Sequence, residues 1–215
     1  MVVSETQEPS ARTRTTARDR ILDLAEAAVL QKGFGATSID ELVAGAGITK
    51  SGFFYHFKDK GDLAKALLER YLERDHAILD DIFGRARELH SDPLHSLLIA
   101  LKLFAEMLET LPESHPGCLA AAYCYQDQLF SREIRDLNAE GILAWRQRML
   151  AQLEEIAVLY PPRFEIDLET AADMLATLVE GGIILSRVLK DKDILARQVL
   201  LYRGFIQSAF MPGPA

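Results

Sequence analysis

Six residues near position 50 have the chemistry needed to contact a nucleic acid. They are small or hydrogen-bonding residues that follow a glycine-bearing turn: Thr49, Lys50, Ser51, Gly52, Tyr55 and His56. A lysine neutralises phosphate, and hydroxyl and imidazole groups bond to base edges or phosphate oxygens. Small residues let a helix approach the floor of the major groove. The pattern is typical of a recognition helix.

Two short predicted helices position these residues. Ser38 followed by Glu41 has the spacing of a capping box and begins a first amphipathic helix. Gly45 and Gly47 bracket Ala46, which suits a turn that needs a positive φ, and Thr49 can cap a second helix that runs to about Phe57. Three aromatic side chains can anchor the second helix to a core: Phe53, Phe54 and Phe57.

An ordinary helical hairpin that never contacts DNA would show the same pattern, so the flanking segments decide between the two interpretations. Upstream, Thr16 begins an amphipathic helix that Gly33 ends. Downstream, the segment 58–63 caps a further helix. A three-helix unit followed by a connecting helix favours DNA binding.

Residues 15 to 74 resemble the TetR family of bacterial transcriptional repressors. The resemblance rests on the helix from Ile21 to Gly33-Phe34 and on three further segments: Thr37-Ser38-Ile39, Ala46-Gly47-Ile48-Thr49-Lys50-Ser51 and Tyr55-His56-Phe57-Lys58-Asp59-Lys60. It implies an all-α fold with an N-terminal three-helix helix-turn-helix DNA-binding domain and a larger helical domain that binds an effector and dimerises. It also implies DNA contacts by Thr37, Ser38 and Lys60, with Thr37, His56 and Lys60 on phosphates.

The resemblance further implies a mechanism. Two recognition helices of a homodimer enter successive major grooves of a palindromic operator, about 34 to 36 Å apart. A small-molecule effector, largely apolar, moves the helix that begins near Lys60 and changes this spacing, which releases the DNA. The resemblance implies no cofactor or metal. The identity of the effector, the sequence of the operator and the choice between repression and activation stay open.

The chain departs from the family pattern at two positions. Gly52 stands where the family often has Thr, Ser or Ala, and Phe54 stands where it often has a phosphate-binding Tyr. Phe54 offers no hydroxyl, so the aromatic phosphate contact is assigned to Tyr55 and His56.

Charge is segregated along the chain, whose net charge is −8. Residues 11–60 hold eight Lys or Arg against six acidic residues, whereas residues 61–215 are strongly acidic. The basic end therefore fits phosphate binding, and the acidic remainder would orient that end toward DNA. No apolar run reaches the roughly 18 residues of a membrane span, and no signal peptide is evident, which predicts a cytoplasmic protein.

Beyond residue 60 the sequence predicts helices with short breaks and no strands, about nine helices in the whole chain. We expect a disordered tail at 1–14, the DNA-binding domain at 15–74 and the effector-binding and dimerisation domain at 75–215. Near the C-terminus, apolar residues recur alternately every four and three residues along two segments, which predicts helix-on-helix packing. Part of this apolar surface is either core or a subunit interface. The resemblance implies a dimer interface formed by Gly181, Gly182, Leu185, Leu189, Val199, Tyr202 and Ile206, and the alternative for the two glycines is that they leave room for a ligand.

The middle helices carry the expected effector site. Its candidates are aromatic, thioether and polar residues: Phe104, Met107, Cys118, Tyr123, Gln126, Trp145, Met149, Met174 and Glu180. Core packing is the alternative for each of them. Cys118 begins a helix, where the dipole lowers a thiol pKa, so a reactive sensor and a buried inert thiol both stay open.

An enzyme and a helical ligand carrier are the rival classes. Glu73 and His76 have the Glu-x-x-His spacing of diiron bundles, but no second copy of the motif is present. The sequence also lacks a phosphate loop or a Cys-x-x-Cys motif. A carrier would not use the basic N-terminal motif, so we expect a regulator and not an enzyme.

Overall fold

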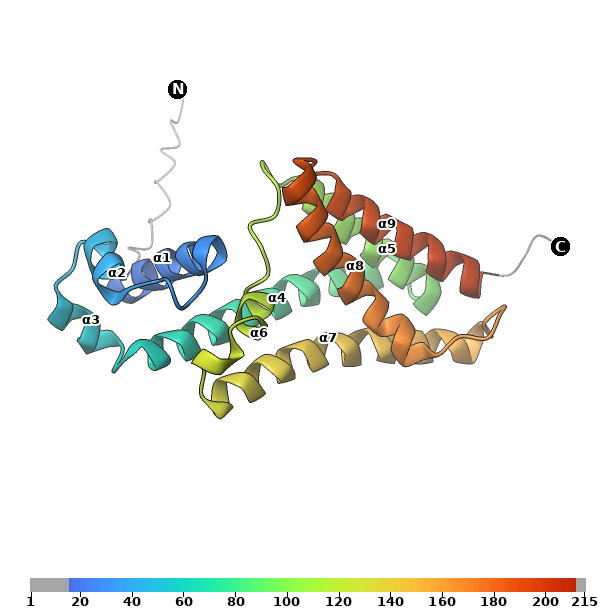
Figure 1. Cartoon of the computed structure of the whole chain (residues 1–215). Helices are drawn as coiled ribbons and strands as arrows, with labels where there is room; N and C mark the ends of the chain where they lie inside the picture. Colours follow the sequence, from blue (N-terminus) through green and yellow to red (C-terminus); the bar gives the residue numbers. More distant parts are fainter. Residues whose placement is uncertain (1–15, 212–215) are drawn as a thin grey trace, which may run out of the picture.

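The computed structural model describes residues 16–211, so the tail expected at 1–14 lies outside the described residues. Over that range the chain forms nine α-helices, one 3₁₀ helix and no strand, which confirms the all-α prediction (Figure 1). The elements are α1 (Ala17–Lys32), α2 (Ile39–Ala46), α3 (Lys50–His56), α4 (Lys60–Leu89), α5 (Pro93–Glu109), α6 (Leu119–Cys124), η1 (Asp127–Leu129), α7 (Arg132–Leu159), α8 (Leu168–Leu189) and α9 (Ile194–Phe210).

Capping residues visible in the sequence set the helix-turn-helix geometry. The Ser38 hydroxyl accepts the Glu41 N–H at 3.2 Å, and the Thr49 hydroxyl accepts the Gly52 N–H at 3.1 Å. Gly47 ends α2 with φ +64°, a left-handed conformation that glycine adopts without strain. These contacts fix the turn between α2 and α3.

Helix α4 joins the two halves of the molecule. Its 30 residues make a rod of about 45 Å, which runs from the helix-turn-helix toward α5 (Figure 1). Leu63 and Leu67, near its start, belong to the core beneath α1–α3, whereas Ile82 and Ala86, near its end, belong to the core of α5, α7, α8 and α9. A movement of this helix would therefore change the packing of both cores.

The N-terminal core also includes residues from the middle of the chain. The Tyr123 and Phe130 rings stack, and the Phe34 ring packs against both at a tilt. The Tyr123 hydroxyl donates to the Ala64 carbonyl at 2.8 Å. Thus α6 and η1 pack directly against the DNA-binding end.

The C-terminal seams pack within one chain. A side chain at Gly182 would place its Cβ 2.9 Å from Leu195 Cδ1 and 3.2 Å from Leu195 Cα, so α8 and α9 touch closely there. Val199, Tyr202 and Ile206 are fully buried in the same core. These four residues are unavailable to a second subunit, and their assignment to the dimer interface is corrected: their regular spacing reports the internal α8–α9 contact.

Among residues 16–211, no helix combines the length and the hydrophobicity that a membrane crossing needs.

Candidate nucleic-acid interface and effector site

Helix α3 presents a polar face to solvent because its aromatic residues divide between two sides. Phe53 and Phe57 are 0% and 1% exposed and anchor the helix, whereas Tyr55 is 85% exposed. Lys50 and Ser51 are also exposed, and His56 is half-buried with its ring 5.0 Å from that of Tyr55. Phe54 is 47% exposed beside them. A single exposed face therefore carries most of the predicted DNA contacts.

Two of these residues already have partners within the protein. The Thr49 hydroxyl caps α3, and Lys50 forms an exposed ion pair with Asp40 at 2.9 Å. An exposed pair is worth little, so Lys50 can exchange this carboxylate for a phosphate at low cost. Gly52 lies half-buried in the first turn of α3, where its N–H bonds to Thr49.

Three predicted contacts outside α3 have structural roles. Thr37 is 1% exposed and its hydroxyl donates to the Gly33 carbonyl at 3.0 Å, so it has no hydroxyl to offer a phosphate. Lys60 donates to the Phe34 carbonyl at 2.7 Å, and its ammonium lies 4.5 Å from the Phe34 ring centroid. Burial lowers the pKa of Lys60. Ser38 is exposed but caps α2. The phosphate assignments of Thr37 and Lys60 are therefore corrected.

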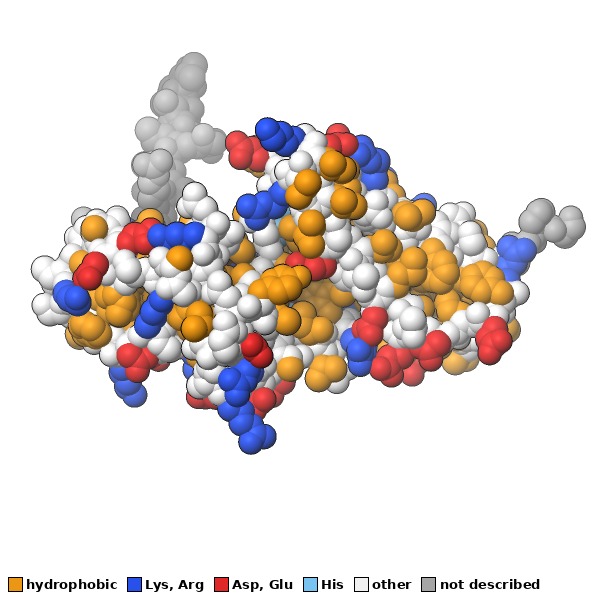
Figure 2. All heavy atoms as spheres, in the orientation of Figure 1, with side chains coloured by type: hydrophobic (Ala, Val, Ile, Leu, Met, Phe, Trp, Pro, Cys, Tyr) orange, Lys and Arg blue, Asp and Glu red, His pale blue; other side chains and the backbone are white. Residues whose placement is uncertain are grey.

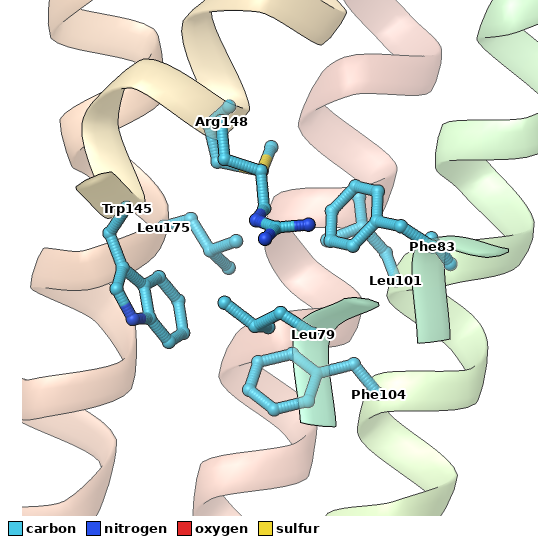
Figure 3. A pocket seen from close by; sticks show the side chains of 9 residues that line it. Leu79, Phe83, Leu101, Phe104, Trp145, Arg148 and Leu175 are labelled. Atoms are coloured by element: carbon cyan, nitrogen blue, oxygen red, sulfur yellow. The ribbon is translucent and has the colours of Figure 1, made fainter. Parts of the chain in front are cut away.

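The expected effector site has an apolar part between α4, α5, α7 and α8. Figure 3 shows Phe83, Phe104 and Trp145 around a small void together with Leu79, Leu101, Arg148 and Leu175. The void has a volume of only about 10 Å³, roughly one water. Any larger ligand must therefore push these helices or side chains apart.

Of the predicted apolar candidates, Phe104, Trp145 and Met149 line this void. Phe104 and Trp145 lie with their ring centroids 6.2 Å apart. Met107 and Met174 are partly buried against the same core and do not line the void.

Several polar side chains lie next to the apolar part of the expected effector site. The Trp145 indole N–H donates to Asp75 of α4 at 2.5 Å. The Tyr71 hydroxyl and the Glu180 carboxylate both interact electrostatically with the Cys118 thiol. Residues of α4, α6, α7 and α8 thus meet at the centre of the molecule.

Cys118 is a half-buried thiol and not an activated one. Its sulfur accepts the Ala121 N–H at 3.4 Å, so it does cap α6 as its position suggested. Burial nevertheless raises the pKa of Cys118 to about 11, with the Glu180 carboxylate as the next cause. The desolvation cost exceeds the favourable helix-terminus effect, which leaves the thiol protonated at neutral pH.

Two residues that were predicted to contact the effector, Tyr123 and Gln126, pack against the DNA-binding end of the molecule instead. Tyr123 is 1% exposed within the N-terminal core. The Gln126 side chain accepts the Gly35 N–H at 3.0 Å, and it fills the space beside Gly33. Both assignments to the effector site are corrected, because these side chains face the DNA-binding end.

Sequence reasoning missed Asp75, although α4 carried a signal for it. The apolar stripe Leu68, Leu72, Leu79, Ile82 has the spacing of a buried helix face, and position 75 falls on that stripe. A carboxylate at a core position must be paired or functional. Tyr71 and Arg148 were missed as well, because charged and aromatic residues on long helices are usually surface or core residues.

Part of the predicted dimer surface is exposed. Leu185 and Leu189 are 44% and 62% exposed on α8, next to exposed Ile184 and Val188. Nothing lies within 4 Å of a Cβ placed at Gly181. Hydrophobic side chains are visible on the surface of this part of the molecule in Figure 2.

His90, Asp92 and His95 have ligand atoms within 4.8 Å of one another, a spacing that a metal ion could bridge. Internal bonds account for the cluster. The Asp92 carboxylate caps α5 and accepts the Tyr160 hydroxyl at 2.6 Å, and His90 Nδ1 accepts the Asp92 N–H at 3.1 Å.

The helical fold and the exposed face of α3 define a helix-turn-helix protein with a second, larger group of helices. Residues 21–67 match the model of the bacterial regulatory proteins of the tetR family. The chain is 30% identical over 186 residues to the "Probable HTH-type transcriptional regulator ArpR" of Pseudomonas putida. The aligned residues cover 85% of this chain and 83% of that protein. It is 27% identical over 161 residues to the HTH-type transcriptional repressor KstR2 of Rhodococcus jostii, 72% of each chain.

Solved structures agree on the fold. A TetR transcriptional regulator from Chloroflexus aurantiacus superposes with a TM-score of 0.73 at 21% identity, over 91% of this chain and 97% of the other. The reduced form of Escherichia coli NemR gives a TM-score of 0.72 at 19% identity, over 92% and 99%. The chain belongs to the tetR family of bacterial regulatory proteins.

Proposed function

We propose that the protein is a dimeric, ligand-responsive transcriptional repressor that binds a palindromic operator. The observation that carries the proposal is the surface of α3, where Ser51 and the 85% exposed Tyr55 face solvent while Phe53 holds the helix to the core. Such a helix can enter the major groove with its N-terminal residues on base edges. Exposed Lys58, just past α3, takes the phosphate role first given to Lys60.

The dimer is proposed to form through the outward face of α8 and α9. Ile184, Leu185 and Val188 expose their side chains on α8, and Leu201 is 60% exposed on α9. Gly181 and Gly204 are open on the same two helices, so a partner helix could approach closely. An exposed apolar face of this kind needs a cover, and a second copy provides one with two-fold symmetry that matches a palindrome.

The effector is proposed to act by wedging open the closed centre of the molecule. Because the void by Trp145 has room for about one water, a bound ligand must displace α4, α7 or α8. Helix α4 runs into the N-terminal core, and α6 leads from Cys118 at one end to Gln126, which holds Gly35. Through both routes, the displacement would move the helix-turn-helix. The boundary between the two domains that we propose, 15–74 and 75–215, falls within α4.

Selection of DNA fragments by the purified protein tests this function. We expect enrichment of palindromic sequences whose half-site centres lie about one helical turn, 34 to 36 Å, apart. The affinity should fall steeply with salt, because phosphate contacts dominate it. Retention of random fragments without a shared sequence would reject the proposal.

A further inference from the structure

An open cleft of about 690 Å³ lies between the helix-turn-helix and the C-terminal end of α8. Ala27 and Leu30 of α1 line one side, Arg187 of α8 lines another, and residues 113–116 line a third. Figure 1 shows the segment between α5 and α6, which includes 113–116, passing between α1 and the end of α8. Sites for small ligands have volumes of roughly 300 to 1,000 Å³, so this cleft has room for one.

The charged side chains that line the cleft are mainly positive. Arg187, Lys190 and Lys192 are exposed on it, and Glu113 is the one acidic residue among the described residues that line it. None of these four residues takes part in an ion pair within residues 16–211. Three cations against one carboxylate leave an excess of two positive charges, which favours a ligand with two negative charges.

Internal hydrogen bonds hold two of the cations in place without neutralising them. The Arg187 Nη1 atom donates to the Pro116 carbonyl at 2.7 Å. The Lys192 ammonium donates to the carbonyls of Glu109 and Leu111, each at 3.2 Å. A carbonyl carries no net charge, and a guanidinium has five N–H donors and an ammonium three. Both side chains therefore keep their charge and at least one N–H donor for a ligand.

His115 adds a neutral donor to the cleft. Its Nδ1 atom accepts the Gly117 N–H at 3.2 Å, so the neutral ring carries its proton on Nε2. Burial lowers the pKa of His115, with the charge of Arg187 as the next cause. The ring is therefore neutral at pH 7 and offers an N–H donor, which suits an anion.

Lys190 is the residue of the cleft that no internal contact explains. It ends α8 with φ +55°, the only positive φ of a non-glycine residue within 16–211. Glycine is the usual residue at such a helix end, and a lysine is strained there. The Lys190 ammonium has no hydrogen bond or ion pair among the described residues, and the adjacent Asp191 is paired with Arg197 at 2.5 Å. A charged ligand would give this lysine a role.

We infer that the cleft binds an organic dianion of the phosphate monoester class, with its phosphate on Arg187, Lys190 and Lys192 and its apolar body on Ala27 and Leu30. Hydrogen bonds from cationic donors to phosphate oxygens are short and strong. This site is separate from the effector site beside Trp145, so the inference goes beyond the proposed function. A ligand held there bridges α1 of the helix-turn-helix to α8.

Three probes that share a naphthalene ring and differ in charge test the site. At pH 7.5, 1-naphthyl phosphate is mainly a dianion, because its second pKa is about 6. Naphthalene-1-sulfonate is a monoanion, and naphthalene-1-methanol is neutral. Isothermal titration calorimetry with the full-length protein measures the affinity of each probe.

Four variants change the charges one at a time. Lys190→Gly removes a cation and suits the positive φ, and Arg187→Gln removes a cation but keeps an N–H donor for the Pro116 carbonyl. Glu113→Gln removes the one acidic residue of the cleft. Lys102→Gln is the matched control, because Lys102 is an exposed lysine of α5 that does not line the cleft.

We expect saturable binding of the phosphate that is about tenfold tighter than that of the sulfonate, and no saturable binding of the neutral probe. Lys190→Gly and Arg187→Gln should each weaken phosphate binding at least fivefold. Glu113→Gln should tighten it at least threefold, and Lys102→Gln should change it less than twofold. Lys190→Gly should melt no lower than the wild type, so its weaker binding would report the lost charge and not unfolding.

Two results would overturn the inference. The first is the absence of saturable phosphate binding, or an affinity that is equal in the wild type and in all four variants. The second would assign the same cations to DNA: a random-sequence duplex displaces 1-naphthyl phosphate, and Lys190→Gly lowers the salt slope of duplex binding by about 1. We expect instead that the duplex leaves phosphate binding unchanged and that Lys190→Gly keeps the salt slope of the wild type.

Discussion

The side-chain oxygen of Gln126 accepts the backbone N–H of Gly35 across 91 positions of sequence, at 3.0 Å. This bond ties the loop between α1 and α2 to the segment that follows α6. The Gln126 amide also occupies the space beside Gly33, where a Cβ would lie 2.3 Å from Gln126 Nε2. Gly33 has φ +84°, so a side chain there would be strained as well as crowded. One link between the segment after α6 and the helix-turn-helix therefore depends on a glutamine and two glycines.

Gln126→Ala should weaken the effector response while preserving the fold. The variant loses the Gly35 bond, which leaves α4 and the Tyr123 stack to carry the coupling. We expect the effector-induced loss of operator affinity to shrink by roughly 1 kcal/mol, a factor of about five, in a DNA-binding assay with and without effector. Gln128→Ala, an exposed glutamine two residues on, is the control. The coupling role is excluded if both variants respond to the effector like the wild type.

Two lysines near the start of α4 should separate DNA contact from domain stability. Lys58 is exposed, so Lys58→Ala should lower the slope of log affinity against log salt by about 1. Lys60 bonds to the Phe34 carbonyl, so Lys60→Ala should destabilise the N-terminal domain by about 1 to 2 kcal/mol and leave the slope unchanged. Thermal melts and salt titrations measure both effects, and a reduced salt slope in Lys60→Ala would return that residue to the DNA interface.

Two glutamate substitutions should distinguish the dimer face from the core. Leu185 is 44% exposed on α8, and Leu185→Glu should yield a folded monomer because it charges only the proposed interface. Val199 is 0% exposed, and Val199→Glu should unfold the domain, since an unpaired buried charge costs several kcal/mol. Sedimentation and circular dichroism provide the measurements. An intact dimer of Leu185→Glu would place the interface on another surface.

The thiol of Cys118 should resist alkylation at neutral pH. Its pKa is raised from 9.0 to about 11, so at pH 7.5 its thiolate fraction should be lower by about a hundredfold than that of an unshifted thiol. Because the shift is upward, the rate with iodoacetamide should keep rising with pH toward 11. Exposed Cys124 is the internal comparison, with both sites followed by mass spectrometry. Labelling of Cys118 as fast as Cys124 at pH 7.5 would contradict the raised pKa of Cys118.

Local signals in the sequence predicted the helices and the DNA-binding face well. Thr16, Ser38 and Thr49 all cap helices in the structure, because capping needs only contacts three residues apart. The face of α3 followed from helical periodicity. The roles of Lys60, Tyr123 and Gln126 could not be predicted in this way, since each depends on a partner 26 to 91 residues away.

Periodicity also left two outcomes unresolved at the C-terminal end. The stripe through Val199 and Tyr202 fits either an internal or an intersubunit seam, and only the packing of α8 on α9 shows that it is internal. Asp75 differs from these residues, because the sequence alone placed it on an apolar helix face. It could have been recognised there as a half-buried charge.

The central claim is that α3 binds the operator through its exposed face, and two tyrosines test it most directly. Tyr55 is 85% exposed on α3, and Tyr125 is 78% exposed after α6, away from that face. Fluorescence anisotropy on a selected operator should show that Tyr55→Ala lowers the affinity at least tenfold, about 1.4 kcal/mol, whereas Tyr125→Ala changes it less than twofold. Equal affinities of Tyr55→Ala and the wild type for the same operator would contradict the account.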